Sequence, residues 1–254
     1  MKNTVIALCG KGGVGKTTLS AIISVLLARQ KELRTLAVDA DPAGGLAMAL
    51  SINVKRSINE VRAETISQIK KKQSDKKDLA VSLEYLLTES MTESGKLAFL
   101  SIGRPQEVGC YCSVNSLLRS ALEVLAENFE ITVIDAEAGI EQINRKVMSR
   151  VDYLFLVSDT SRKGVKVAET IAGVAVQVTG QDRAGLFVNR VRDEAEVENI
   201  RKMTGLSVIG FSPEDDTIRE FDGQGRSFLE LPDCPALLAV EKALEGVLQT
   251  VRNS

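Results

Sequence analysis

The glycine-rich stretch Gly10-Lys11-Gly12-Gly13-Val14-Gly15-Lys16-Thr17-Thr18 constrains the fold of this chain more than any other feature. An apolar run, residues 4–9, precedes it, and a helical pattern, residues 19–30, follows it. The stretch matches G-x-x-x-x-G-K-[ST] in full, in the strand-then-helix context that this pattern requires. The sequence therefore predicts a phosphate-binding loop at the first turn of an α/β fold.

The residue types in this loop suit a nucleotide and a magnesium ion. Its glycines allow the backbone to form a concavity lined with N–H donors. Lys16 brings a point charge to the outer phosphates, Thr17 offers a hydroxyl to Mg²⁺, and the following helix adds its positive end. We expect the whole stretch, from Gly10 to Thr18, to contact the nucleotide.

Apolar segments of strand length alternate with helical patterns along the rest of the chain. Strands are predicted at residues 4–9, 35–39, 97–102, 131–135, 153–157, 184–189 and 207–211. Helices are predicted at 19–30, 114–128, 163–178, 194–204 and 236–251. Because near-continuous apolar strands indicate burial on both faces, we expect an α/β fold with an open, mostly parallel sheet and helices on both faces. The 254 residues are expected to form one ATPase domain, 1–254.

Composition excludes several classes of protein. Lys plus Arg number 32 and Asp plus Glu 34, and this net charge of −2 favours neither nucleic acid nor a membrane surface. No apolar run reaches the roughly 18 residues of a spanning helix, and the early strand leaves no room for a signal peptide, so we expect a cytoplasmic protein. The chain has no histidine, so a metal would need thiolates or carboxylates, and a general base would be acidic.

Lys11 adds a second cation directly after the first glycine of the loop. The form GKGGVGKTT resembles the deviant Walker A family of ATPases, which includes nitrogenase iron protein, septum-site and chromosome-partitioning ATPases, and metal-centre maturation factors. The resemblance implies an Mg²⁺-dependent ATPase with Lys11 and Lys16 as catalytic groups. It also implies that Lys11 reaches the nucleotide of a second subunit, so that ATP binding and homodimer formation are one event. A solvated lysine at the rim of the loop is the alternative.

The segment Val38-Asp39-Ala40-Asp41-Pro42 ends the second strand, at the edge where parallel sheets bind ligands. It resembles the first switch segment of the family, which implies that Asp41 orients the water that attacks the γ-phosphate and that Asp39 supports it. A turn cap is the alternative for Asp39. Nitrogenase iron protein has a further aspartate where this chain has Gly45, which separates the chain from that reductase branch.

A Walker B strand is indicated by the apolar run Ile131-Thr132-Val133-Ile134-Asp135. We expect Asp135 to hold Mg²⁺ through water, while Thr17 of the phosphate loop binds the ion directly. The residues that follow resemble the second switch segment, where Gly139 lets an amide move toward the γ-phosphate. The role of Glu137 stays open between a metal relay, a partner contact and a local cap.

Phe187-Val188-Asn189-Arg190-Val191 ends a later strand. The resemblance implies that Asn189, with Arg190 beside it, lies on the adenine edge, where one amide can donate to N7 and accept from N6. It also implies that Phe211 and Pro213 flank the base.

Gly109-Cys110-Tyr111-Cys112-Ser113 offers two soft ligands from one short segment. A twofold axis beside them would complete a set of four, whereas two small buried side chains are the alternative. Cys9 and Cys234 have no cysteine neighbour, and we expect them to be structural.

The phosphate loop, the DADP and CYC motifs and the segment DAEAGIE together resemble the CooC family over the whole chain. Members of that family are accessory ATPases of carbon monoxide dehydrogenase and acetyl-CoA synthase. The resemblance implies that Cys110 and Cys112 of two subunits hold one Ni²⁺, with Zn²⁺ as a competitor, for insertion into such a client enzyme. A reductase like nitrogenase iron protein and a positioning ATPase acting on membrane or DNA are the rival functions.

Two further segments bear on partners. The lysine-rich residues 66–77 are expected to form an exposed insertion between the second and third strands, either a solvated helix or loop or a docking surface. The last helix, 236–251, has a polar face that is not basic, and we expect it to pack on the sheet rather than on a membrane.

Overall fold

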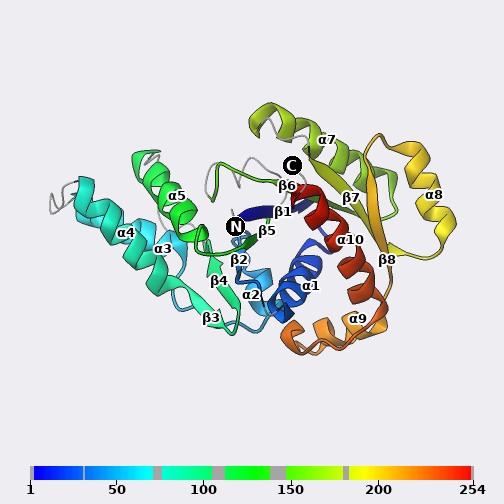
Figure 1. The fold of residues 1–254 in the computed structure, drawn as a ribbon, viewed down its shortest axis with the longest axis horizontal. Coiled ribbons are helices and arrows are strands. Elements are labelled where there is room, and N and C mark those ends of the chain that lie inside the picture. The colour runs from blue at the N-terminus through cyan, green and yellow to red at the C-terminus, as the bar shows by residue number, and fades with distance from the viewer. Residues whose placement is uncertain are drawn as a thin grey trace.

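The computed structural model describes residues 3–30, 32–70, 76–104, 112–137, 147–179 and 183–252. Its strands form one sheet in the order β3-β4-β2-β5-β1-β6-β7-β8 (Figure 1). Their bounds are β1 Thr4–Gly10, β2 Thr35–Asp39, β3 Thr92–Ser94, β4 Leu97–Ser101, β5 Ile131–Asp135, β6 Tyr153–Ser158, β7 Ala184–Val191 and β8 Val208–Pro213. Each neighbouring pair is parallel, apart from the short edge pair β3 and β4. The predicted open, mostly parallel sheet is confirmed.

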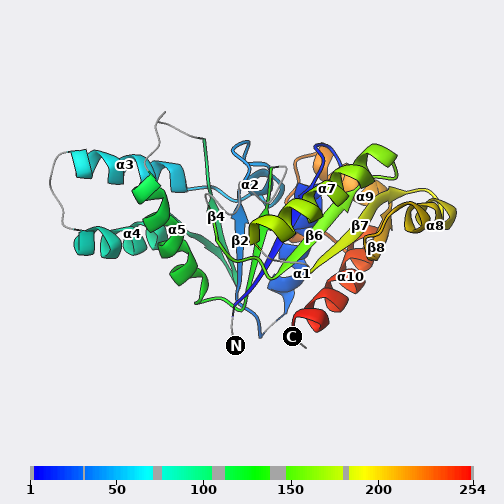
Figure 2. The same cartoon turned by 90° about the horizontal axis from the view of Figure 1, so that it is seen from above.

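Helices cover both faces of this sheet, as predicted. One face carries α3 (Ile58–Lys70), α4 (Lys76–Ser90), α5 (Cys112–Ala126), α7 (Arg162–Thr179) and α8 (Glu194–Met203). The other carries α1 (Lys16–Arg29), α2 (Gly45–Ala49), α9 (Asp216–Gly223), the 3₁₀ turn η1 (Phe228–Glu230) and α10 (Pro235–Arg252). Figure 2 shows α3, α4 and α5 gathered at the β4 end of the sheet, with α8 at the β8 end.

The central strand β1 shows why the strands are apolar throughout. Val5, Ala7 and Cys9 point into one helical layer, whereas Ile6 and Leu8 point into the other. Successive side chains of a strand face opposite ways, so a strand buried on both sides has no polar face. Burial raises the pKa of the Cys9 thiol to about 12. Cys9 is therefore a core residue, as expected.

The lysine-rich segment lies between β2 and β4, as expected. Its described residues belong to two helices, α3 and α4, and Ile66 is buried in the core. The expected exposure is therefore wrong for Ile66. Residues 71–75 lie outside the described residues. The edge strand β3 and the short helix α2 were not predicted, because three and five residues are too short to show a period.

The C-terminal helix α10 packs on the sheet, which confirms the prediction. Its buried side chains, Leu237, Val240, Ala243, Leu244, Val247 and Leu248, join the core beside α1. Cys234, just before this helix, is buried as well. Among the described residues, no helix has the length and apolar character that crossing a membrane requires.

Candidate nucleotide site

The phosphate loop joins β1 to α1 at the edge of the sheet where the parallel strands end. Two of its glycines have no room for a side chain. A Cβ on Gly10 would lie 2.2 Å from the Val157 carbonyl oxygen, and one on Gly15 would lie 2.3 Å from Nδ2 of Asn189. Gly15 also has a φ of 96°, in the left-handed region that favours glycine. Glycine is therefore required at both positions, because a side chain would overlap a neighbouring residue, and at Gly15 also because of the backbone conformation.

Lys16 opens α1 and is held inside this loop. Its side chain is buried, and Nζ donates to the carbonyl oxygen of Lys11 at 3.3 Å. Among the described residues, this buried ammonium has a single long hydrogen bond, which suits a polyphosphate that would supply further oxygen acceptors.

Asp135, at the end of β5, is fixed by two hydroxyl groups of α1. Thr17 Oγ1 donates to one carboxylate oxygen at 2.8 Å, and Ser20 Oγ donates to the other at 2.9 Å. Burial raises the pKa of Asp135, while these two hydrogen bonds act to lower it. Thr17 and Asp135 therefore meet as the Walker pattern predicts. Ser20 was not predicted, because a serine among apolar helix residues gives no signal of its partner.

Asp39 caps the N-terminus of α2. One of its oxygens accepts from the backbone N–H groups of Leu46 and Ala47, at 3.0 and 3.1 Å, and the other accepts from Asp41 N at 3.2 Å. The side chain thus holds the loop that carries Asp41. Burial, together with the carboxylate of Asp135 on the adjacent strand, raises the pKa of Asp39 to about 7.

The acidic groups in this region fit a divalent cation. Asp39 and Asp135 are paired in register on β2 and β5, and Asp41 follows closely, with Lys16 as the nearby buried cation. The described residues contain no group of three or more carboxylates or thiols arranged to hold one ion. An ion at Thr17 would therefore take most of its ligands from phosphates and water, as Mg²⁺ commonly does.

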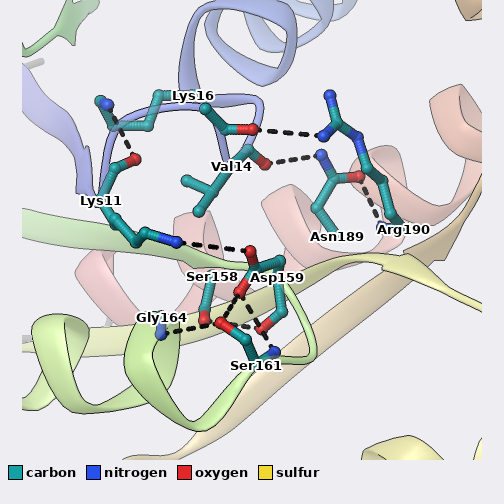
Figure 3. A network of polar contacts seen from close by, with 10 residues as sticks. Lys11, Val14, Lys16, Ser158, Asp159, Ser161, Gly164, Asn189 and Arg190 are labelled. Atoms are coloured by element: carbon teal, nitrogen blue, oxygen red, sulfur yellow. Dashed lines mark hydrogen bonds and ion pairs between the residues drawn. The ribbon is translucent and has the colours of Figure 1, made fainter.

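Lys11 faces an acidic residue of its own chain. Its Nζ lies 3.9 Å from Oδ2 of Asp159, and each side chain is about one third exposed, 34% and 33% (Figure 3). Asp159 follows β6 and is held by Ser161, whose backbone N donates to Oδ1 at 3.1 Å. Glu137, just beyond Asp135, is exposed.

A cleft of about 250 Å³ adjoins the phosphate loop. Thr18 and Leu19 of α1 line one wall, Asn189 and Arg190 line another, and Pro213 leads into the acidic segment before α9. Phe211 is not among the lining residues, because it packs against the core on the opposite face of the sheet. The structure therefore does not bring Phe211 to this cleft, whereas Asn189, Arg190 and Pro213 do converge there.

The amide of Asn189 is already bonded to the protein. Its Nδ2 donates to Val14 O at 2.9 Å, and its Oδ1 accepts from Arg190 N (Figure 3). The same Oδ1 also accepts from Ser212 Oγ. In this arrangement the amide oxygen already has two donors, so the contact of Asn189 with adenine stays a prediction. Arg190 has a φ of 59° and donates from Nη1 to Gly13 O at 3.2 Å.

Two predicted site residues, Cys110 and Gly139, lie outside the described residues. Cys112 is the first residue of α5, but its side chain is not among those described.

A phosphate loop with Lys16, Thr17 and Asp135 convergent at the strand ends defines a P-loop nucleotide-binding protein. Residues 5–228 match the model of the CobQ/CobB/MinD/ParA nucleotide binding domain (CbiA), and the chain belongs to this family. It is a P-loop ATPase of the MinD and ParA type.

Similar proteins cover nearly the whole chain. An ATP-binding protein of Methanocaldococcus jannaschii is 34% identical over 98% of both chains. The carbon monoxide dehydrogenase accessory protein CooC of Rhodospirillum rubrum is 26% identical over 90% of this chain and 91% of its own. The septum site-determining protein MinD of Bacillus subtilis is 25% identical over 98% and 90%. The structure of MinD with Mg-ADP from Pyrococcus horikoshii superposes with a TM-score of 0.69 at 20% identity over 96% of both chains, which confirms the fold.

Proposed function

We propose that this chain is an ATP-dependent metallochaperone that works as a homodimer. ATP and Mg²⁺ close two subunits through Lys11, and Cys110 and Cys112 of both subunits hold one Ni²⁺ between them. Hydrolysis reopens the dimer and releases the metal to a client, carbon monoxide dehydrogenase or acetyl-CoA synthase. Nickel is the cargo in this cycle, and Zn²⁺ competes for the same thiolates.

One observation carries the proposal: the segment with the two cysteines begins at the nucleotide site. It leaves β4 at Ile102, whose N–H donates to the carbonyl oxygen of Asp39 at 2.8 Å. Asn59, at the start of α3, holds the next turn, because its Nδ2 donates to Gly103 O at 2.8 Å. A change in the loop that Asp39 anchors would therefore be transmitted to the chain that leads to Cys110.

The described residues of the phosphate loop and the strand ends account for the ATPase steps. Lys16 binds the outer phosphates, and Thr17 and Asp135 would hold Mg²⁺, which supplies charge neutralisation to those phosphates when bound. Asp41 orients the attacking water. One of its oxygens accepts from Ala43 N at 2.8 Å, and the other accepts no hydrogen bond from the part of the chain that the structure describes, so it can face the water. Because the chain lacks histidine, a carboxylate is the available proton acceptor.

Lys11 is the proposed link between nucleotide and dimer. An exposed pair such as Lys11 with Asp159 is worth at most about 1 kcal/mol, so a γ-phosphate of the second subunit can replace it. ATP can shift the dimer only by the difference in its affinity for the open and closed forms. The contact of Lys11 with the nucleotide of the second subunit supplies this difference in affinity.

Similarity to CooC of Rhodospirillum rubrum over nine tenths of the chain supports the nickel cargo, together with the CYC motif. The test is a double variant, Cys110→Ser with Cys112→Ser, measured for nickel binding by equilibrium dialysis beside ATP binding. We expect loss of tight nickel binding with ATP affinity retained. The matched control, Cys234→Ser, replaces a thiol buried in the fold and should keep its nickel. Unchanged nickel stoichiometry in the double variant would falsify the site.

A positioning ATPase is the second candidate. The similarity to MinD of Bacillus subtilis, over 98% of this chain, favours it. The exposed face of α10 carries Leu238, but beside it lie Glu241, Lys242 and Glu245, a weak basis for binding an anionic membrane. ATP-dependent co-sedimentation with anionic liposomes or with DNA would favour this candidate, and its absence would favour the metallochaperone.

An iron-sulfur reductase is the third. A Cβ on Gly45 would lie 3.2 Å from Cγ2 of Thr17, so an aspartate at this position would sit beside the proposed Mg²⁺ ligand. The chain lacks that carboxylate. A brown protein with visible absorption after anaerobic purification would revive the reductase.

A further inference from the structure

Asn189 lies where the phosphate loop, β7 and β8 meet. Its side chain is 8% exposed and lines the cleft, and Ser212 behind it is fully buried. Three hydrogen bonds surround the amide: Nδ2 to Val14 O at 2.9 Å, Arg190 N to Oδ1 at 3.0 Å and Ser212 Oγ to Oδ1 at 2.8 Å. Figure 3 shows the amide pointing at the Val14 carbonyl.

Two of these partners fix which end of the amide is nitrogen. The Val14 carbonyl can only accept, so the atom facing it is the NH₂ group. The backbone N–H of Arg190 can only donate, so the atom facing it is the oxygen. The Ser212 hydroxyl also faces that oxygen, and it must therefore donate. The orientation of the amide follows from its neighbours.

This arrangement limits what the amide can offer to a bound base. An amide oxygen has two lone pairs, and two donors fill them. The NH₂ group has two hydrogens, and Val14 takes one of them. Among the described residues no acceptor takes the other, which can serve an acceptor such as the N7 atom of a purine.

We infer that Ser212 is a positioning residue for the base: it holds the Asn189 amide so that the remaining N–H donates to purine N7. This inference rests on the proposed nucleotide site, in which Asn189 contacts the base. Without the hydroxyl, the amide oxygen keeps only the N–H of Arg190 as a donor, and the amide plane can rotate. Ser212 acts through Asn189 and does not itself touch the base.

The close approach of the amide to the phosphate loop supports this role. The Cβ that Gly15 lacks would lie 2.3 Å from Nδ2 of Asn189, so the loop leaves space for this amide. The bond from Nδ2 to Val14 O then ties β8, through Ser212 and Asn189, to the loop that binds phosphate. Base and phosphate recognition share one set of buried hydrogen bonds.

The test compares ATP with 7-deaza-ATP, in which a C–H group replaces N7, by isothermal titration calorimetry. A neutral hydrogen bond predicts that the wild-type chain binds ATP about 2- to 10-fold more tightly than the analogue. Asn189→Ala should bring this ratio close to one. Ser212→Ala should lower it most of the way, whereas Ser212→Thr, which keeps the hydroxyl, should retain it. Ser207→Ala, an exposed serine just before β8, is the matched control and should keep the wild-type ratio.

The ratio separates positioning from simple stability, because a loosened fold weakens both ligands equally. A Ser212→Ala chain that binds both more weakly but keeps the wild-type ratio would overturn the inference. A wild-type chain that binds ATP but does not distinguish the two nucleotides would overturn the N7 contact as well. The proposed function fails separately, in the nickel measurement on the cysteine variant or in a chain that does not bind ATP.

Discussion

Replacing Asp39 by asparagine should stabilise the nucleotide-free chain at alkaline pH. Asp39 is fully buried, and burial together with the charge of Asp135 raises its pKa from 3.8 to about 7. The folded chain therefore holds the Asp39 proton more tightly than the unfolded chain does. The protonated Asp39 carboxyl therefore favours the folded chain. This stabilisation is present in full below a pH of about 4 and is lost as the pH rises through about 7.

The structure sets the size of this effect. A rise in pKa from 3.8 to about 7 corresponds to about 4 kcal/mol at pH 8, where the carboxylate must be charged in the fold. Asparagine avoids this penalty but gives up the acceptor for the N–H of Asp41, at a cost of about 1 kcal/mol. By the same linkage, the stability of Asp39→Asn relative to wild type should improve by about 2 to 3 kcal/mol between pH 5 and pH 8.

Urea unfolding at pH 5, 6, 7 and 8, in EDTA and without nucleotide, measures this difference directly. Asp41→Asn is the matched control: it removes a partly buried carboxylate from the same loop, and it separates the effect of the buried Asp39 charge from the general loss of an acid there. Saturating Mg²⁺ and ADP should reduce the advantage of Asp39→Asn, because the cation offsets the buried charges. A stability difference that stays constant from pH 5 to pH 8, or that falls, would refute the reasoning.

Three further predictions concern the phosphate loop and its neighbours. Asp159→Asn removes the partner of Lys11, so the ATP-bound dimer should form at a protein concentration lower by up to about fivefold. Analytical ultracentrifugation measures this, and an unchanged dimer dissociation constant would contradict it. Gly15→Ala puts a Cβ 2.3 Å from Nδ2 of Asn189, on a residue whose φ is 96°. The affinity for ATP should therefore fall about tenfold or more while the circular dichroism spectrum stays native, and an affinity near that of wild type would contradict this. Ser20→Ala removes a hydrogen bond from the Asp135 carboxylate and should raise the Mg²⁺ concentration for half-maximal ATP binding about threefold or more. Ser24→Ala, one helical turn further on, should leave that concentration unchanged. Equal shifts in the two variants would contradict this prediction.

The sequence predicted the central part of the fold well, because buried parallel strands are continuous apolar runs. The strands at 35–39 and 131–135 have the predicted bounds, and the phosphate loop lies between a strand and a helix as its pattern requires. Helices α3 and α4 were missed because their composition is polar, and only a few side chains, such as Ile58 and Ile66, attach them to the core.

The site was predictable only where a motif carries the chemistry. Lys16, Thr17 and Asp135 belong to such motifs, and the structure brings them together. Ser20 and Ser212 do not: their partners are 115 and 23 residues away, and nothing in the sequence pairs them. The sequence did not show which face of the sheet the side chain of Phe211 would take, and in the structure it lies on the face away from the cleft.

The central claim is that two chains share one nickel ion under the control of the nucleotide. The most direct test is the molar mass of the wild-type chain in solution, measured by light scattering together with nickel analysis of the same fractions, with Mg²⁺ and ATP or ADP present. We expect a dimer with one nickel ion for every two chains. A monomer that holds one nickel ion per chain, or a nucleotide-bound dimer that excludes nickel, would contradict it.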